Sequence, residues 1–298
     1  MFLAAEVGEQ TDYQITTDPN MADIVVINSC SVTQEAEKSC HRWVRQLRRK
    51  NPSVRVMVLG CYAQLKPKEI ASWGGVERVL GNQEKFRLVD YLSMPSVSGE
   101  SGEVAVSPLS GLRDFHGAFS SPGQIGARTR AFLKVQDGCD YGCTFCTIPL
   151  SRGGSRSSGI LEVRHRVQKL LAKGVREIVF TGVNLGDFGR RKGSRVGSLL
   201  DLIRDLDSID MPARFRLSSV EPNLLHDEII NCVASSRHWL PHFHLPLQSG
   251  QDRTLKRMRR RYLTQHYEDR IGRIKEEIPH ACIGADVMVG FPGETPSD

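Results

Sequence analysis

The feature that most constrains this chain is a short loop carrying three cysteines, Gly138-Cys139-Asp140-Tyr141-Gly142-Cys143-Thr144-Phe145-Cys146. The spacing is C-x3-C-x2-C, and the loop follows residues 131–136, which have the pattern of a β-strand. Protein iron–sulfur clusters usually take four cysteines, so three leave one iron open to an outside ligand. An open coordination position is typical of catalytic metal sites. The loop therefore predicts a catalytic cluster just beyond a strand.

A structural zinc site is the alternative for these cysteines. It requires a fourth ligand, and no partner pair follows at ordinary spacing, although the distant His242 or His244 could supply one. These two histidines share one face of their predicted strand, where packing histidines are common, so we do not predict them as ligands.

Composition limits the class of protein. The chain has 298 residues, 40% of them hydrophobic and 25% charged, which predicts a soluble protein of two domains. We expect a cytoplasmic location without membrane contact, because no apolar run approaches a bilayer span of roughly 20 residues and no signal peptide pattern opens the chain. Eight cysteines in such a chain favour metal binding or catalysis over disulfides. The net charge of +6 is compatible with an anionic partner such as RNA.

Residues 1–92 have the pattern of a small parallel α/β domain. Three β-rich runs, 23–28, 54–59 and 76–81, alternate with helical segments. Cys30 and Cys61 come directly after the first two runs, at the sheet edge where ligands bind in such folds. We therefore predict both as metal ligands. Cys40, Cys232 and Cys282 lie inside helical or strand patterns and are predicted to be small buried residues.

An amphipathic helix is expected after the first run. Ser31 with Gln34 fits a capping box at its start. The predicted buried positions are Ala36, Cys40, Trp43, Val44 and Leu47. The opposite face carries Lys38, Arg42, Arg45, Arg48, Arg49 and Lys50.

Residues 93–128 are rich in Ser, Gly and Pro and are expected to be an interdomain linker. From residue 129 to 298 a longer strand–helix alternation predicts a parallel barrel or partial barrel. The expected strands are 131–136, 176–181, 214–218, 241–245 and 283–289, separated by helices at about 159–173, 197–207, 224–235, 251–260 and 264–277.

Polar and glycine residues follow all five expected barrel strands, where such folds place their chemistry. Phe145 is a candidate to pack on a bound adenine, or else a loop anchor. Glu221 and Gln248 are candidates for hydrogen bonds to a cofactor, with a solvated charge as the alternative for Glu221. Arg152 and Arg156, like the basic run 256–261, are candidates for RNA phosphate contacts, or else a solvated face.

These motifs together resemble the radical S-adenosylmethionine (SAM) methylthiotransferases. The resemblance begins with the cysteine loop and its continuation through Gly153, and it extends over nearly the whole chain. The other matching stretches are 22–33, 58–64, 180–186, 216–222, 242–250 and 286–295. The likeness is greatest to the branch that methylthiolates C2 of N6-threonylcarbamoyladenosine beside the tRNA anticodon. Sister branches act on isopentenyl-adenosine in tRNA or on a ribosomal protein.

The resemblance implies two 4Fe–4S clusters. Cys139, Cys143 and Cys146 would hold the cluster that cleaves SAM, and Cys30 and Cys61 would hold an auxiliary cluster that presents sulfur. One SAM would donate methyl and another would supply the 5′-deoxyadenosyl radical. Arg260 matches an arginine of the family next to the cofactor. The implied partners are tRNA, an electron donor such as a flavodoxin or ferredoxin, and a sulfur source.

The chain departs from the family pattern at both ends. The family's first strand and first auxiliary cysteine would lie before residue 1, and its last barrel strand and RNA-binding TRAM domain would lie after residue 298. We therefore expect a partial chain with an incomplete auxiliary site and weak tRNA affinity. The rival interpretation from another class is an inactive iron–sulfur protein that binds RNA.

Overall fold

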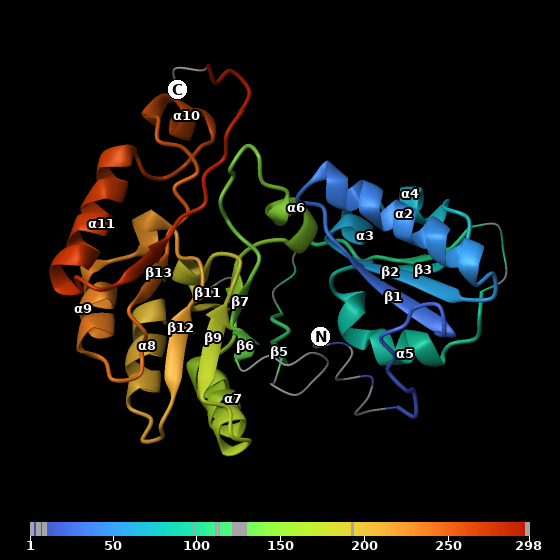
Figure 1. Ribbon diagram of the computed structural model, residues 1–298, viewed down its shortest axis with the longest axis horizontal. Helices are drawn as coiled ribbons and strands as arrows, with labels where there is room; N and C mark the ends of the chain where they lie inside the picture. Colours follow the sequence, from blue (N-terminus) through green and yellow to red (C-terminus); the bar gives the residue numbers. More distant parts are fainter. Residues whose placement is uncertain are drawn as a thin grey trace. The chain divides into compact units, whose positions relative to one another are not determined.

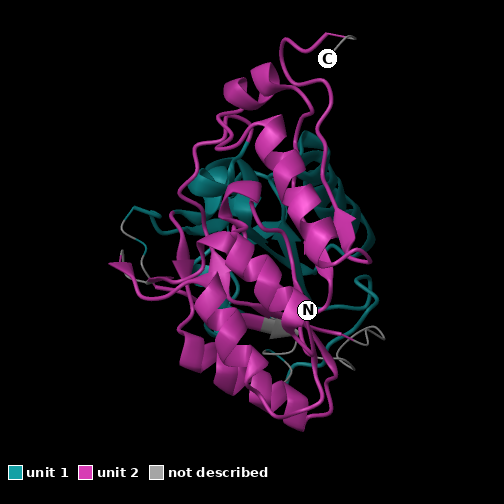
Figure 2. Ribbon diagram, turned by 90° about the vertical axis from the view of Figure 1, so that its left-hand side faces the viewer, with its two compact units in different colours: residues 1–112, 146–153 teal, residues 113–145, 154–298 magenta. Residues whose placement is uncertain are grey.

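The computed structural model describes residues 11–97, 99, 101–110, 112, 114–120, 130–191 and 194–295, together with Leu3 and Val7. The chain divides into two compact units, residues 1–112 with 146–153, and residues 113–145 with 154–298 (Figure 2). The grouping of 146–153 with the first unit is a feature that the sequence did not predict. Within the described residues, no helix is long and apolar enough to cross a membrane.

The first unit is built on a parallel four-stranded sheet in the order β1-β2-β3-β4. Its strands are β1 (Ile24–Ser29), β2 (Arg55–Gly60), β3 (Val76–Leu80) and β4 (Glu103–Ala105). Alternate side chains of β2 enter different cores: Val56 and Val58 pack on one side of the sheet, Met57 and Leu59 on the other. Burial on both faces is the reason that these strands are continuous apolar runs.

Helices cover both faces of this sheet. They are α2 (Gln34–Lys50), α3 (Cys61–Leu65), α4 (Pro67–Ala71) and α5 (Leu88–Ser93), with the 3-10 turn η1 (Glu84–Arg87). In Figure 1, α2 and α4 lie on one side of the sheet and α5 on the other. The first side contains Cys40, Val44 and Leu47 of α2, and the second contains Leu88 and Leu92 of α5.

Helix α2 differs from its prediction at two points. Its N-cap is Thr33, whose side chain accepts a hydrogen bond from the Ala36 amide at 3.1 Å, so the predicted Ser31–Gln34 capping box is wrong. Trp43 is 54% exposed, so it is not a core residue. The buried stripe is the i, i+4, i+7 series Cys40, Val44 and Leu47, and Trp43 lies at its border, about 40° around the helix from Leu47.

The stretch 93–128, which the sequence analysis expects to be an interdomain linker, contains two short strands. β4 extends the first unit's sheet by pairing with β3, and β5 (Ala118–Ser120) pairs antiparallel with β6 (Ala131–Lys134) of the second unit. A three-residue strand at the edge of an existing sheet gains its hydrogen bonds from that sheet, so it needs little pattern of its own. Part of this stretch, 121–128, lies outside the described residues.

The second unit contains the partial barrel. β12 (Arg214–Leu217), β9 (Glu177–Thr181) and β6 are parallel neighbours, and an isolated bridge between Ser219 and His244 continues the row to β13 (His242–His244) and β14 (Cys282–Gly284). Two small ribbons complete the described strands: β7 (Gln136–Asp137) with β8 (Arg156–Ser157), and β10 (Arg190–Arg191) with β11 (Ser194–Arg195).

The helices of this unit confirm the predicted alternation. They are α7 (Ile160–Ala172), α8 (Leu199–Asp207), α9 (Asp227–Ser235), α10 (Asp252–Arg257) and α11 (Thr264–Glu277), with the 3-10 turns η2 (Leu185–Asp187) and η3 (Pro222–Leu224). α7, α8, α9 and α11 line the outer side of the strands (Figure 1). The predicted strand 283–289 is wrong beyond Gly284, since Val287 makes an isolated bridge and Val287 and Val289 are exposed.

The two faces of the partial barrel differ in chemistry. One face of its strands packs against the helices in a single apolar core that includes Leu133, Phe180, Phe215 and Phe243. The alternate positions leave that core and are mostly polar: Lys134, Glu177, Thr181, Arg216, His242 and His244. The strands therefore present a polar face opposite the core, as expected of a sheet that binds a polar ligand.

Candidate functional site

The cysteine loop begins at Gly138, where φ of +70° turns the chain out of β7. Gln136, just before it, is fully buried and ties two strand-end loops together. Its Oε1 accepts the amides of Val183 and Asn184 at 2.8 Å each, and its Nε2 donates to the Gly138 carbonyl at 2.8 Å. The sequence analysis did not single out Gln136, and the only signal was a polar residue at the end of an apolar strand.

The sulfur atoms of the loop receive N–H donors. Cys139 Sγ accepts the Tyr141 amide at 3.4 Å and lies 4.0 Å from Asn184 Nδ2. Cys143 Sγ accepts a hydrogen bond from Arg260 Nη1 at 3.2 Å. Such donors stabilise thiolates and coordinated sulfur, so this environment suits iron–sulfur ligands.

The third cysteine of the loop, Cys146, is half-buried and belongs to the first unit, whereas Cys139 and Cys143 belong to the second. Within the described part of the chain, no three His, Cys, Asp or Glu side chains form a group that could hold a metal ion. The residues nevertheless fit a cluster and its ligand by their chemistry. Asn184 is 1% exposed, and its Oδ1 is buried without a hydrogen-bond partner among the described residues. Such an atom, next to Cys139, is suited to accept a bond from a bound polar molecule.

The cysteine loop is also held by hydrogen bonds to the C-terminal end of α10. Thr144 donates from its amide to the Met258 carbonyl at 3.2 Å and from its hydroxyl to the Arg257 carbonyl at 3.1 Å. Arg259 then takes φ of +57°, and the Arg260 amide bonds back to the Leu255 carbonyl at 2.9 Å. This reversal is the usual end of a helix, although an arginine occupies the place where glycine is common. It directs Arg260 toward Cys143.

Arg260 is the centre of a buried charged group. Its side chain is 3% exposed and forms an ion pair with Glu221, whose side chain is 16% exposed. Its Nε also donates to the Tyr262 hydroxyl at 3.2 Å, and that hydroxyl donates to the Pro246 carbonyl at 2.6 Å. The Arg260 side chain, after α10, therefore links the loop after β12 through Glu221 and the loop after β13 through Tyr262 and Pro246.

The electrostatics of this group follow from burial and pairing. Burial works to lower the pKa of Arg260, but Glu221, Tyr262 and Cys143 raise it, so the guanidinium stays charged. Burial raises the pKa of the Glu221 carboxyl above its ordinary value, and Arg260 offsets only part of that rise. The ion pair favours the charged form of both partners. Burial also raises the pKa of Tyr262 to about 12, so its hydroxyl remains a donor at neutral pH.

The other predicted cofactor residues lie at the same strand ends of the second unit. Gln248 has φ of +67°, held by its amide donating to the Asp286 carbonyl at 2.9 Å and its carbonyl accepting the Met288 amide at 2.8 Å. Left-handed backbone costs a non-glycine residue about 1–2 kcal/mol and often marks a functional position. Phe145 is half-buried. Glu221 is not the solvated charge that was the alternative, because it is buried and paired.

The second candidate site lies at the carboxyl edge of the first unit's sheet. Cys30 follows β1 and is exposed, and Cys61 follows β2 as the first residue of α3 and is buried. Gly60 makes the abrupt turn between β2 and α3 with φ of +105°. A Cβ at Gly60 would collide with the Ser29 carbonyl, so no other residue fits this turn.

Arg152 lies at Cys61, and its role as an RNA contact stays a prediction. Its Nε donates to Cys61 Sγ at 3.3 Å, and Asn82 Nδ2 lies 3.7 Å from the same sulfur. Asn82 also donates to the Ser151 carbonyl at 2.6 Å, which holds α6 (Ile148–Arg152) against this edge. Burial works to raise the pKa of Cys61, but Arg152, Ser151 and Asn82 together hold it below its ordinary value. The site favours a Cys61 thiolate, the form that binds metals.

The prediction that Arg156 contacts RNA is wrong. Arg156 is 5% exposed, and its guanidinium bonds to the carbonyls of Asp114 and Gly154 at 3.0 Å each and lies 3.4 Å from an Asp137 carboxylate oxygen. A guanidinium buried in this way cannot reach a phosphate. The sequence shows that a cation follows the cysteine loop, but it says nothing about the direction of the side chain.

The cysteines predicted to be structural fall into two groups. Cys40 is buried, and burial raises the pKa of its thiol to about 11, so it remains protonated. Cys232 packs partly buried against the second unit's core. Cys282 is exposed, so the prediction of burial is wrong there. It lies at the start of β14, whose burial pattern is partly open.

A cavity of about 730 Å³ lies away from these residues. Arg176, Glu177, Arg214 and His238 line it, at the amino ends of β9 and β12. Parallel sheets bind ligands beyond their carboxyl ends, so this cavity is not the candidate site.

Comparison with known proteins identifies the family. Residues 133–298 match the family described as the Radical SAM superfamily, and residues 3–81 match Uncharacterized protein family UPF0004. The chain is 36% identical to the threonylcarbamoyladenosine tRNA methylthiotransferase MtaB of Aquifex aeolicus, over 97% of this chain and 69% of that protein. It is also 36% identical to MtaB of Thermotoga maritima, over 99% of this chain and 65% of that protein.

The chain belongs to the radical SAM methylthiotransferase family. A tRNA-2-methylthio-N(6)-dimethylallyladenosine synthase of Clostridium tetani is 30% identical over 96% of the chain and 63% of that protein. The chain thus spans about two thirds of the length of the curated relatives it matches.

Solved structures agree on the fold. The radical SAM methyltransferase TsrM from Kitasatospora setae, solved with tryptophan and a SAM analogue, superposes with a TM-score of 0.65 at 13% identity. The match covers 99% of this chain and 60% of TsrM. The cobalamin-dependent radical enzyme OxsB superposes with a TM-score of 0.56 at 11% identity, covering 89% of this chain and 41% of OxsB. At this identity the likeness supports the α/β fold class and partial barrel.

Proposed function

We propose that this chain carries the catalytic part of a tRNA methylthiotransferase that acts on C2 of N6-threonylcarbamoyladenosine beside the anticodon. The observation that carries the proposal is that the 36% identity to MtaB enzymes spans both cysteine sites, since the match covers 97% of the chain. Identity is 33–36% to MtaB enzymes and 30–33% to the dimethylallyladenosine synthases, which favours threonylcarbamoyladenosine as the substrate. The enzyme would act in the cytoplasm, where tRNA is modified.

Cys139, Cys143 and Cys146 would hold the radical SAM cluster. When bound, this cluster supplies the single electron that cleaves the sulfonium of SAM. Arg260 lies at Cys143, where its positive charge favours the electron-rich state of the site. Asn184 offers an unpartnered buried oxygen beside Cys139 for a donor group of SAM, and Gln248, Glu221 and Phe145 remain candidates for its ribose, amino-acid and adenine parts.

Cys30 and Cys61 would be ligands of an auxiliary 4Fe–4S cluster that presents sulfur. Arg152 and Asn82 orient the Cys61 sulfur and stabilise its thiolate. Catalysis would need an external electron donor, such as a flavodoxin or ferredoxin, and a source of sulfur. Because Arg152 bonds to Cys61, it would influence catalysis through this cluster ligand and not by contact with the substrate.

The test is anaerobic reconstitution of the chain with iron and sulfide, followed by incubation with dithionite, SAM and tRNA carrying threonylcarbamoyladenosine. We expect 5′-deoxyadenosine and, because the chain offers only two ligands to the auxiliary cluster, a low yield of the methylthiolated nucleoside, both detected by mass spectrometry. Cys143→Ala should abolish both products, and Cys40→Ala is the matched control because that buried thiol is not a proposed ligand.

Other outcomes contradict the proposal in distinct ways. Labelled methyl appearing in a ribosomal protein would favour the sister branch that modifies protein. Modification of isopentenyl-adenosine in preference to threonylcarbamoyladenosine would favour the other tRNA branch. Bound iron without SAM cleavage would leave an iron–sulfur RNA-binding protein, and zinc in place of iron would leave a structural metal site.

A further inference from the structure

Helix α2 carries a straight line of four cations on its outer face. Lys38, Arg42, Arg45 and Arg49, hereafter the basic stripe, are spaced i, i+4, i+7 and i+11. At about 100° per residue these positions fall within roughly 60° of one another around the helix, and they span about 16 Å along it. The stripe lies opposite Cys40, Val44 and Leu47, the residues that α2 buries.

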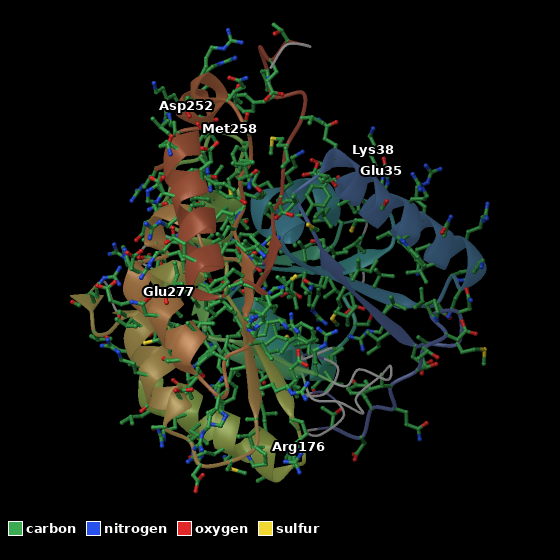
Figure 3. All side chains as sticks on the ribbon, turned by 60° about the vertical axis from the view of Figure 1, so that its left-hand side comes forward. Glu35, Lys38, Arg176, Asp252, Met258 and Glu277 are labelled. Carbon is green, nitrogen blue, oxygen red and sulfur yellow. The ribbon has the colours of Figure 1, made fainter. Side chains whose placement is uncertain are left out.

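The stripe is exposed and carries little counter-charge. All four side chains are in exposed residues, and Figure 3 labels Lys38 with Glu35 on the side of α2 away from the sheet. Arg42 pairs with Glu35 at 3.3 Å, with 61% and 69% of the two side chains exposed. An ion pair so open to water contributes little. Lys38, Arg45 and Arg49 make no ion pair within the described residues.

Helix stability accounts for the presence of a cation at only one end of the basic stripe. Arg49 lies in the last turn, where cations favour the helix dipole. Lys38 lies in the second turn, where the same dipole opposes a positive charge. Arg48 differs from the stripe, because its guanidinium bonds to the Val54 carbonyl at 3.2 Å and has a structural partner. Folding alone therefore gives no reason for cations along the full length of this face.

The exposed aromatic residue of α2 does not belong to the stripe. Trp43 is 54% exposed, but at about 100° per residue it lies about 100° around the helix from Arg42 and about 40° from the buried Leu47. The observation that points to nucleic acid is therefore the row of exposed cations, which suits the phosphates of a nucleic acid backbone.

The position of α2 relates the stripe to the candidate site of the same unit. The helix starts four residues after Cys30, the exposed cysteine at the carboxyl end of β1. From that edge the helix runs back over one face of the sheet, with Lys38 nearer to the edge and Arg49 farther. An RNA strand lying along α2 would thus approach the sheet edge that holds both Cys30 and Cys61.

We propose that the basic stripe binds the phosphate backbone of the substrate tRNA next to the modified nucleotide. The inference rests on the proposed function for the identity of the RNA. It assigns a docking surface to the N-terminal unit, in addition to any other RNA-binding part of the protein.

The test compares two variants of the full chain with equal loss of charge. The first replaces the stripe with glutamine, Lys38→Gln, Arg42→Gln, Arg45→Gln and Arg49→Gln. The control replaces four exposed cations of the second unit, Lys169→Gln, Lys173→Gln, Arg176→Gln and Arg204→Gln. Glutamine keeps helix propensity close to that of lysine and arginine, so both variants should fold, and circular dichroism checks this.

The probe is a fluorescein-labelled anticodon stem–loop RNA, and its dissociation constant is measured by anisotropy over a range of salt concentrations without SAM or reductant. We expect the stripe variant to bind at least tenfold more weakly than the control. The slope of log affinity against log salt should fall by about 3, since each lost phosphate contact removes about 0.7.

Equal affinity and slope in the two variants would overturn the inference. So would displacement of the RNA by polyglutamate as efficiently as by unlabelled RNA, since the surface would then suit an acidic protein. Failure of the proposed function is a separate result. RNA binding that depends on the stripe, with no methylthiolation, would support the docking surface and contradict the proposed function. Methylthiolation that does not depend on the stripe would support the proposed function and contradict the docking surface.

Discussion

The ion pair between Arg260 and Glu221 should be one of the most sensitive points of the second unit. Their side chains are 3% and 16% exposed, so both charges are removed from water and each compensates the other. Breaking a buried pair by removing one partner typically costs about 3–5 kcal/mol, because the remaining charge stays buried. Arg260→Met should fall in this range, since it also removes the donor to Tyr262.

Glu221→Gln should cost less than Arg260→Met. The glutamine amide oxygen still accepts a bond from Arg260, and arginine keeps its bonds to Cys143 and Tyr262. The double variant Arg260→Met with Glu221→Gln leaves no buried charge in this pair. We therefore expect its cost to be smaller than the sum of the single costs by about 2 kcal/mol, the coupling energy of residues in direct contact.

The measurement is the free energy of local opening of the second unit from native-state hydrogen exchange, which separates it from the first unit. The matched control is Arg237→Met, which removes an arginine from an ion pair with Asp210 whose side chains are 70% and 102% exposed. We expect that control to cost less than about 0.5 kcal/mol. A cost for Arg260→Met as small as that of the control, or purely additive single costs, would refute the argument that the pair is buried and coupled.

Two further predictions concern the first unit. Burial works to raise the pKa of Glu77, but its hydrogen bonds to Arg55 hold that pKa below the usual range. The ionised Glu77 carboxylate therefore stabilises the fold fully above the unfolded pKa of about 4.3. This contribution is lost as the pH falls through the lower pKa of the folded state. Glu77→Gln should lower the free energy of urea unfolding by about 3 kcal/mol at neutral pH and by much less in acid, and an equal loss at both pH values would contradict this. With the cysteines of the loop replaced by alanine, Arg152→Met should lower the reduction potential of a cluster held by Cys61, because a hydrogen bond to its sulfur is lost. An electron paramagnetic resonance titration checks this against Arg42→Met, and equal potentials would show that Arg152 acts only on structure.

The order of strands and helices could be predicted because it depends on local pattern. β1, β2, β3, β9 and β12 lie within a residue or two of their predicted bounds, since short segments with β-branched and aromatic residues, whether continuous or alternating with polar ones, are a local signal. The short strands β4 and β5 were missed, because an edge strand of three residues is stabilised by its neighbour in the sheet and carries little signal in its own residues.

The direction of single side chains could not be predicted in the same way. Arg152 and Arg156 are four residues apart and both flank glycines, yet one bonds to Cys61 and the other is buried beside Asp137. The partners come from segments 91 and 19 residues away. No local pattern contains this information.

The sequence by itself therefore determined the two domains' fold class, the family, and the placement of cysteines at strand ends, because periodicity and motif spacing are properties of neighbouring residues. Only the tertiary structure decided which groups surround those cysteines: Arg260 at Cys143, and Arg152 with Asn82 at Cys61. Each of these contacts joins residues distant in the chain, and its geometry exists only once the strands and helices have packed and excluded water from the charged groups between them.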